Sequence, residues 1–85
     1  MITTEQTQWK KCLELIRSRL NPQQYTTWFE PIGFKSYDIA TKEVTIYVPS
    51  HFFYEYLEEH YRQLIYLAIF HVFGPDSKLV YKVAL

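Results

Sequence analysis

The chain has 85 residues, of which 48% are hydrophobic and 19% are aromatic, and its nine basic and nine acidic side chains cancel. This length makes one small domain that depends on a dense core, and the balanced charge excludes a general electrostatic attraction to nucleic acid or to an anionic membrane. The single cysteine, Cys12, excludes an internal disulfide, and no signal peptide or apolar run of about 20 residues is present, so we expect a soluble cytoplasmic domain.

An amphipathic helix is predicted first. The segment from Thr3 to Gln6 has the Thr-x-x-Gln spacing of a capping box, so this helix is expected to begin at Thr4 and to reach Leu20. Its apolar face is expected to point to the core and comprises Trp9, Cys12, Leu13, Ile16 and Leu20.

A short second helix is predicted directly afterwards. Asn21 is a good N-cap, and Pro22 suits the first helical position because its missing N–H would have no partner there. Pro31 ends the helix because it forces the preceding residue out of helical geometry. The side chains expected to point inward are Tyr25, Trp28 and Phe29.

Three strands are predicted. Residues 32–37 and 44–48 are joined by a loop of hairpin length, which predicts antiparallel neighbours. Residues 79–85 alternate, with Leu79, Tyr81 and Val83 on the expected inner side. Because this last strand runs to the final residue without a polar tail, we expect the domain to come from a longer protein.

One long helix is predicted between the second and third strands, from Ser50 as N-cap to Gly74. A helical projection places Phe52, Tyr66 and Phe70 in nearly one column away from the core, and spaces Glu58 and Arg62 for an ion pair. The expected core stripe comprises Phe53, Leu57, Tyr61, Leu64, Ala68 and Val72, with Ile65 and Leu67 at its edges. The order α-α-β-β-α-β predicts an α+β fold with a three-stranded sheet packed on helices.

Several motifs follow one another in a specific order along the chain. They are Trp9-x-x-Cys12-Leu13, Tyr25-x-x-Trp28-Phe29-x-Pro31-Ile32, Tyr47-Val48-Pro49-Ser50-x-Phe52, then Tyr61 and Val80-x-x-Val83. In this order the chain resembles the N-terminal domain of the bacterial chromosomal replication initiator DnaA family, over essentially its whole length.

The resemblance implies a KH-like arrangement and an adaptor domain without catalytic activity. It implies three kinds of partner, namely the replicative helicase, other copies of the initiator, and regulators of initiation. ATP is expected only in a separate ATPase module further along such proteins, so no cofactor is expected in this domain.

Phe52 is the first candidate site residue, because it occupies the second position of the long helix and points away from the core stripe. The resemblance places a helicase-contacting phenylalanine there. Gln24 matches a position of the second helix that is acidic in some relatives and shares the helicase and regulator surface. Here it is a neutral amide, so a carboxylate contribution is absent, and a solvated glutamine without a partner is the alternative.

Trp9 matches the tryptophan through which the family's domains self-associate, with Cys12 one turn later flanking that contact. The alternative for both residues is burial in the core. Tyr66 and Phe70 would extend a partner surface along the long helix, or lie beneath the C-terminal residues.

Catalytic and metal sites are not expected. His51, His60 and His71 lie too far apart on one helix to share an ion, and no nucleophile-base set can be assembled. The alternative function is a weak single-stranded nucleic-acid-binding module, in which exposed aromatic rings stack on bases. The Gly-x-x-Gly loop of nucleic-acid-binding KH domains is missing, which argues against it.

Overall fold

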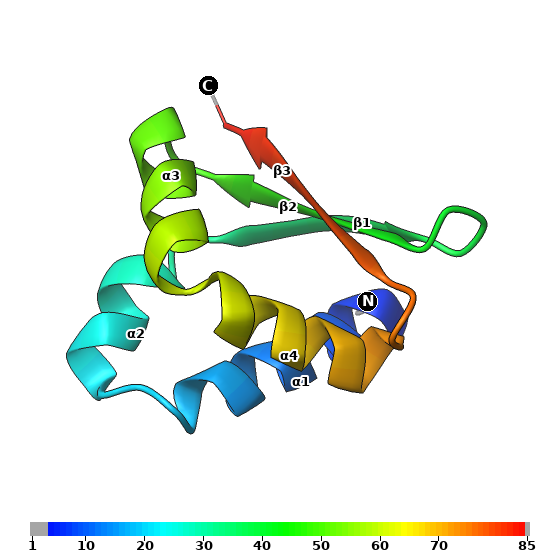
Figure 1. Ribbon diagram of the computed structural model, residues 1–85, viewed down its shortest axis with the longest axis horizontal. Coiled ribbons are helices and arrows are strands. Elements are labelled where there is room, and N and C mark those ends of the chain that lie inside the picture. Colours follow the sequence, from blue (N-terminus) through cyan, green and yellow to red (C-terminus); the bar gives the residue numbers. More distant parts are fainter. Residues whose placement is uncertain (1–3, 85) are drawn as a thin grey trace.

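The computed structural model describes residues 4–84 (Figure 1). The elements are α1 Thr4–Arg17, α2 Pro22–Trp28, β1 Gly33–Asp38, β2 Glu43–Val48, α3 His51–His60, α4 Arg62–Phe73 and β3 Lys78–Val83. The predicted α+β fold is therefore confirmed. The expected capping residue Thr3 and the terminal Leu85 lie outside the described residues. No helix within residues 4–84 is long and apolar enough to cross a bilayer.

The three strands form one mixed sheet in the order β1-β2-β3. β1 and β2 pair antiparallel, as predicted, and β3 pairs parallel to β2. In Figure 1 the helices lie on one side of this sheet, with α1 and α4 along it and α2 and α3 at one end. One face of the sheet is thus covered and the other is open.

The middle strand supplies the centre of the core. Val44, Ile46 and Val48 are all fully buried, because successive side chains of a strand point to opposite faces and these three share the covered face. The helices add further buried side chains: Trp9, Cys12, Ile16, Leu57, Ile65, Ala68 and Ile69. Phe29 and Ile32, which flank the turn after α2, complete this core.

The prediction of one long helix is wrong, because this segment forms two helices, α3 and α4, which are separated by a break at Tyr61. The backbone of Tyr61 leaves helical geometry with φ −126° and ψ 7°, and its ring meets Phe29 edge-on at 5.3 Å. After the break the buried positions are Ile65, Ala68 and Ile69 in place of the predicted Leu64, Ala68 and Val72. Leu64 and Val72 are only half-buried.

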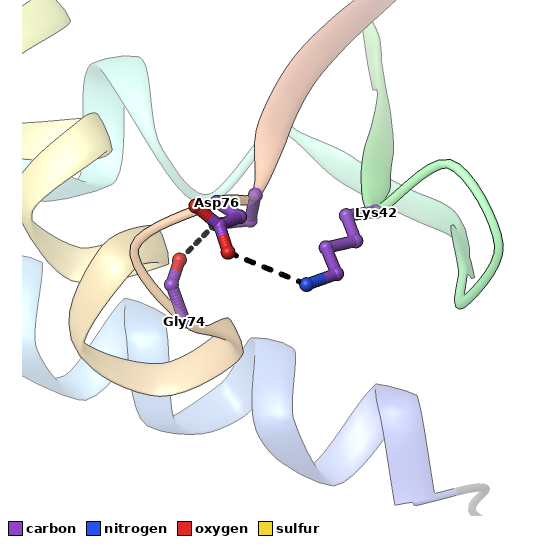
Figure 2. Close-up of polar contacts among 4 residues, drawn as sticks. Lys42, Gly74 and Asp76 are labelled. Carbon is purple, nitrogen blue, oxygen red and sulfur yellow. Dashed lines mark hydrogen bonds and ion pairs between the residues drawn. The ribbon is translucent and has the colours of Figure 1, made fainter.

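Two turns meet beside the last strand. Lys42, in the β1–β2 turn, reaches Asp76 in the α4–β3 turn with Nζ 3.4 Å from the carboxylate (Figure 2). The backbone N–H of Lys78 donates to the carbonyl oxygen of Lys42 at 2.8 Å. Gly74 ends α4 with φ 117°, a conformation that other residues adopt only with strain. These contacts fix where β3 begins.

The two neighbouring aromatic residues at the end of α2 are expected to differ in their effect on stability. Phe29→Ala should lower the free energy of unfolding by about 3 to 5 kcal/mol, because a fully buried ring leaves a cavity. Trp28→Ala should cost less, because Trp28 is only half-buried. Urea unfolding followed by circular dichroism measures both values, and an equal or larger loss for Trp28→Ala would contradict this packing.

Candidate protein-interaction surface

The start of α3 holds Phe52 in an exposed position. Ser50 caps the helix, and its hydroxyl oxygen accepts a hydrogen bond from the backbone N–H of Phe53 at 3.1 Å. This cap satisfies one of the amides that a helix start leaves without a partner, and it sets the direction of the first turn. Phe53 then points to the core, whereas the side chain of Phe52 is 67% exposed.

Further aromatic rings of α3 and α2 lie next to Phe52. The ring centroid of Phe52 lies 6.4 Å from that of Tyr56, one turn later. Tyr56 stacks on Trp28 of α2 at 3.6 Å with an interplanar angle of 6°, and it also contacts His60 at 4.3 Å. Sequence reasoning missed Tyr56, although its spacing of four residues from Phe52 places both on one helix face.

Gln24 lies on the helix that meets this row. Its amide oxygen accepts from the backbone N–H of Asn21, and the Asn21 side chain accepts from the backbone N–H of Gln24, which forms a complete capping box. The predicted N-cap is confirmed, and the Asn-x-x-Gln spacing is the signal from which this pairing could have been read. Gln24 is exposed and precedes Trp28 by one turn.

Gln24 and Phe52 lie on either side of one aromatic contact. Trp28 joins α2 to α3 through Tyr56 and through Phe53, whose ring is 5.0 Å away. The two helices run in opposite directions in Figure 1, and each candidate residue precedes its stacked ring by four positions. We name this set of residues, Gln24, Trp28, Phe52 and Tyr56, the α2–α3 surface.

Trp9 and Cys12 are buried in their own domain. The indole of Trp9 is only 5% exposed and stacks on Phe34 of β1 at 6.0 Å, and Cys12 has no exposed surface. The Cys12 thiol donates to the carbonyl oxygen of Ala68 at 3.6 Å, so it cannot flank a partner in this conformation. A hollow of about 370 Å³ opens beside the Trp9 edge, lined by Gln6, Trp9, Lys10, Leu13, Ile32 and Phe34.

Tyr66 and Phe70 do not continue the line of Phe52, because the break at Tyr61 places them on a different helix. Tyr66 is half-buried, with the Arg62 guanidinium 5.2 Å from its ring centroid, whereas Phe70 is 40% exposed. Their rings lie 5.4 Å apart. Leu67, predicted at the edge of the core stripe, is 45% exposed beside them.

Glu58 is engaged in structural contacts. Its carboxylate accepts from Arg62 at 3.3 Å, which confirms the predicted pair, and also from the Tyr81 hydroxyl at 3.0 Å. Burial and then the neighbouring Glu58 charge raise the pKa of Tyr81 well above its usual range, so this hydroxyl stays protonated.

Among residues 4–84, no three His, Cys, Asp or Glu side chains gather as a metal site would require.

Comparison with known proteins decides the family. Residues 6–69 match the family model described as the DnaA N-terminal domain. The chain belongs to the DnaA N-terminal domain family. It is 43% identical over 83 residues, or 98% of its length, to the chromosomal replication initiator protein DnaA of Flavobacterium psychrophilum. It is 42% identical to the DnaA protein of Chlorobaculum tepidum over 91% of the chain, and 40% identical to that of Bacteroides fragilis over 88%.

The match covers only one part of each relative. The three alignments span 17%, 15% and 15% of the relatives' lengths, so the chain corresponds to about one sixth of a DnaA protein. The α2–α3 surface and the Trp9 hollow both fall within residues 6–69, which the family model matches. β3 lies beyond the family-model match but within the 83-residue alignment to the Flavobacterium psychrophilum protein.

The thiol of this DnaA domain is expected to react slowly. Burial raises the pKa of Cys12 to about 12, so at about pH 8 the folded domain holds almost no thiolate, which is the species that attacks disulfide reagents. In the unfolded chain the thiol ionises near its ordinary value of about 8.5. Because the unfolded state therefore loses its proton first, this group's contribution to stability is lost as the pH rises from about 9 towards 12.

Absorbance after addition of a chromogenic aromatic disulfide at about pH 8 measures this difference. We expect the native domain to react at least about 100-fold more slowly than the same domain in denaturant, because reaction requires opening. Equal rates in the two conditions would show that Cys12 is accessible in the native state.

Proposed function

We propose that this domain is the protein-interaction adaptor of a bacterial DNA replication initiator, acting in the cytoplasm. In this proposal it recruits the replicative helicase and regulators of initiation through the α2–α3 surface, and it associates with other copies of the initiator. The observation that carries the proposal is the exposed ring of Phe52, which stands on the first turn of a capped helix beside the stacked rings of Tyr56 and Trp28.

Burial of the Phe52 ring in a partner would contribute binding free energy. Burying a phenylalanine side chain contributes roughly 1.5 to 3 kcal/mol, and rigid aromatic anchors near the centre of an interface commonly carry most of its binding energy. Binding through Phe52 would require little ordering of the backbone, because the residue already lies in a helix. The exposed amide of Gln24 adds a polar group at the rim of the same surface.

Removal of the Phe52 ring tests this proposal. Phe52→Ala should weaken binding of the replicative helicase of the same organism by about tenfold or more, because the anchor is lost. The free energy of unfolding should change by less than about 1 kcal/mol, because the ring is largely exposed at home. The matched control is Ile39→Ala, which removes an even more exposed hydrophobic side chain, 75% exposed in the β1–β2 turn.

Amide chemical shifts of the labelled domain measure both binding and its place. Helicase should shift residues of α2 and the start of α3, and Ile39→Ala should bind as the parent does. The competing function is weak binding of single-stranded DNA. If only DNA shifted these residues, with an affinity that falls steeply with salt, the adaptor proposal would be rejected.

Self-association is proposed to use the surface above Trp9, since the indole itself is buried. Leu13→Ala should weaken association by about fivefold or more, because Leu13 lines the Trp9 hollow. Leu15→Ala is the control, because both leucines are half-buried on α1 and Leu15 is not among the hollow's lining residues. Sedimentation velocity over a concentration series measures association. Identical behaviour of the two variants, both folded, would exclude this surface.

A further inference from the structure

β3 forms an open edge of the sheet. It pairs with β2 on one side, and within residues 4–84 no strand lies on its other side. Its register with β2 is regular over all six residues, whereas the other edge strand, β1, has an irregularity between Phe34 and Ser36. Proteins commonly blunt exposed edges with bulges, prolines or charged side chains such as lysine. β3 pairs regularly and contains no proline, so its backbone is a template for pairing, while Lys78 and Lys82 oppose pairing with another copy of the same strand.

The backbone groups that face this edge can be identified. The N–H groups of Lys78 and Ala84 donate to the carbonyl oxygens of Lys42 and Val48, both at 2.8 Å, so they point towards β2. Because successive residues of a strand direct these groups to opposite sides, Leu79, Tyr81 and Val83 direct theirs to the open edge. Three N–H donors and their carbonyl acceptors are therefore arranged to receive an extended segment.

A hollow of about 380 Å³ runs beside the same strand. Its walls come from α3, α4 and β3, and comprise His51, Tyr54, Glu58, Tyr66, Leu79, Val80, Tyr81 and Val83. The side chain of Val80 points to the opposite face of the sheet from those of Leu79 and Tyr81. Because Val80 also lines the hollow, the hollow reaches the backbone at the open edge of β3. The rings of Tyr54 and Tyr81 meet edge-on at 4.8 Å and give the hollow an aromatic floor.

The charged side chains of β3 indicate which kind of segment would bind at its edge. Lys78 and Lys82 are exposed on the open face, about 13 Å apart along an extended strand, and neither makes an ion pair with any described residue. The hollow on the other face holds the Glu58 carboxylate. A complementary strand therefore carries acidic side chains on one face and apolar ones on the other. A second copy of β3 would bring Lys78, Val80 and Lys82 to the open face, so its only charges there would repel those already present.

We propose that the β3 edge is a docking site for an extended segment of a partner protein, which adds a strand to the sheet. Its backbone pairs with Leu79, Tyr81 and Val83, its carboxylates lie beside Lys78 and Lys82, and an apolar side chain enters the Tyr54–Tyr81 hollow. This site is separate from the α2–α3 surface and does not depend on the adaptor function proposed for Phe52.

The test uses a short capped peptide in which glutamate and valine alternate, and a second peptide in which lysine replaces glutamate. Amide shifts of the labelled domain report where each binds. Val83→Pro removes an edge donor without touching the β2 ladder, and prolines are tolerated at such positions, whereas Val83→Thr keeps the N–H. Lys82→Glu reverses one charge on an exposed side chain. Thermal melting checks that each variant folds.

We expect the acidic peptide to shift residues 79–83 and Tyr66, and the basic peptide to bind at least about tenfold more weakly. Val83→Pro should weaken the acidic peptide by about tenfold relative to Val83→Thr, and Lys82→Glu should reverse the preference between peptides. If Val83→Pro does not fold, the charge reversal alone decides. The proposal is overturned if β3 does not shift, if both peptides bind alike, or if the edge instead mediates a dimer that Val83→Pro abolishes.

Discussion

The contact between Phe29 and Tyr61 is the one on which the arrangement of the helices depends. Phe29 is fully buried directly after α2, and it meets Tyr61 where α3 ends and α4 begins. Because the two helices separate there, α3 packs against β2 with Leu57 buried, while Ala68 of α4 lies against Cys12 of α1. One straight helix could not fill both places. The break therefore decides which aromatic rings reach the surface and where.

Two surfaces of different chemistry result from this arrangement. The α2–α3 surface presents an exposed aromatic ring, so its binding energy would come from apolar burial and its specificity from the polar rim. The β3 edge presents backbone donors and acceptors, so its specificity would come from side chains at alternate positions. The two surfaces share no residue, although both include side chains of α3.

Local chemistry in the sequence predicted most of the fold. Asn21, Ser50 and Gly74 marked helix ends correctly, and the alternation of Val44, Ile46 and Val48 identified the buried strand face. The break at Tyr61 could not be predicted, because no proline or glycine occurs there and Tyr61 packs against Phe29, a residue far away in the chain. The error in the core stripe and in the column of Phe52, Tyr66 and Phe70 follows from that one omission.

The candidate site was predicted unevenly for the same reason. Exposure of Phe52 followed from its place in the first turn of a capped helix, which is local. The burial of Trp9 and Cys12 depends on Phe34 and Ala68, which come from β1 and α4, so the amphipathic pattern allowed burial but could not exclude an overhanging ring. The edge of β3 needed the sheet order, which the sequence pattern alone does not provide.

The parallel pairing of β2 with β3 has a consequence for how the domain is made. β2 lies in the middle of the chain, and its parallel partner is the last element, so the sheet cannot close until Val83 has left the ribosome. Until then β2 exposes an unpaired edge, and α4 has no third strand beside it. Closure of the sheet during synthesis is therefore delayed until the whole domain has emerged from the ribosome.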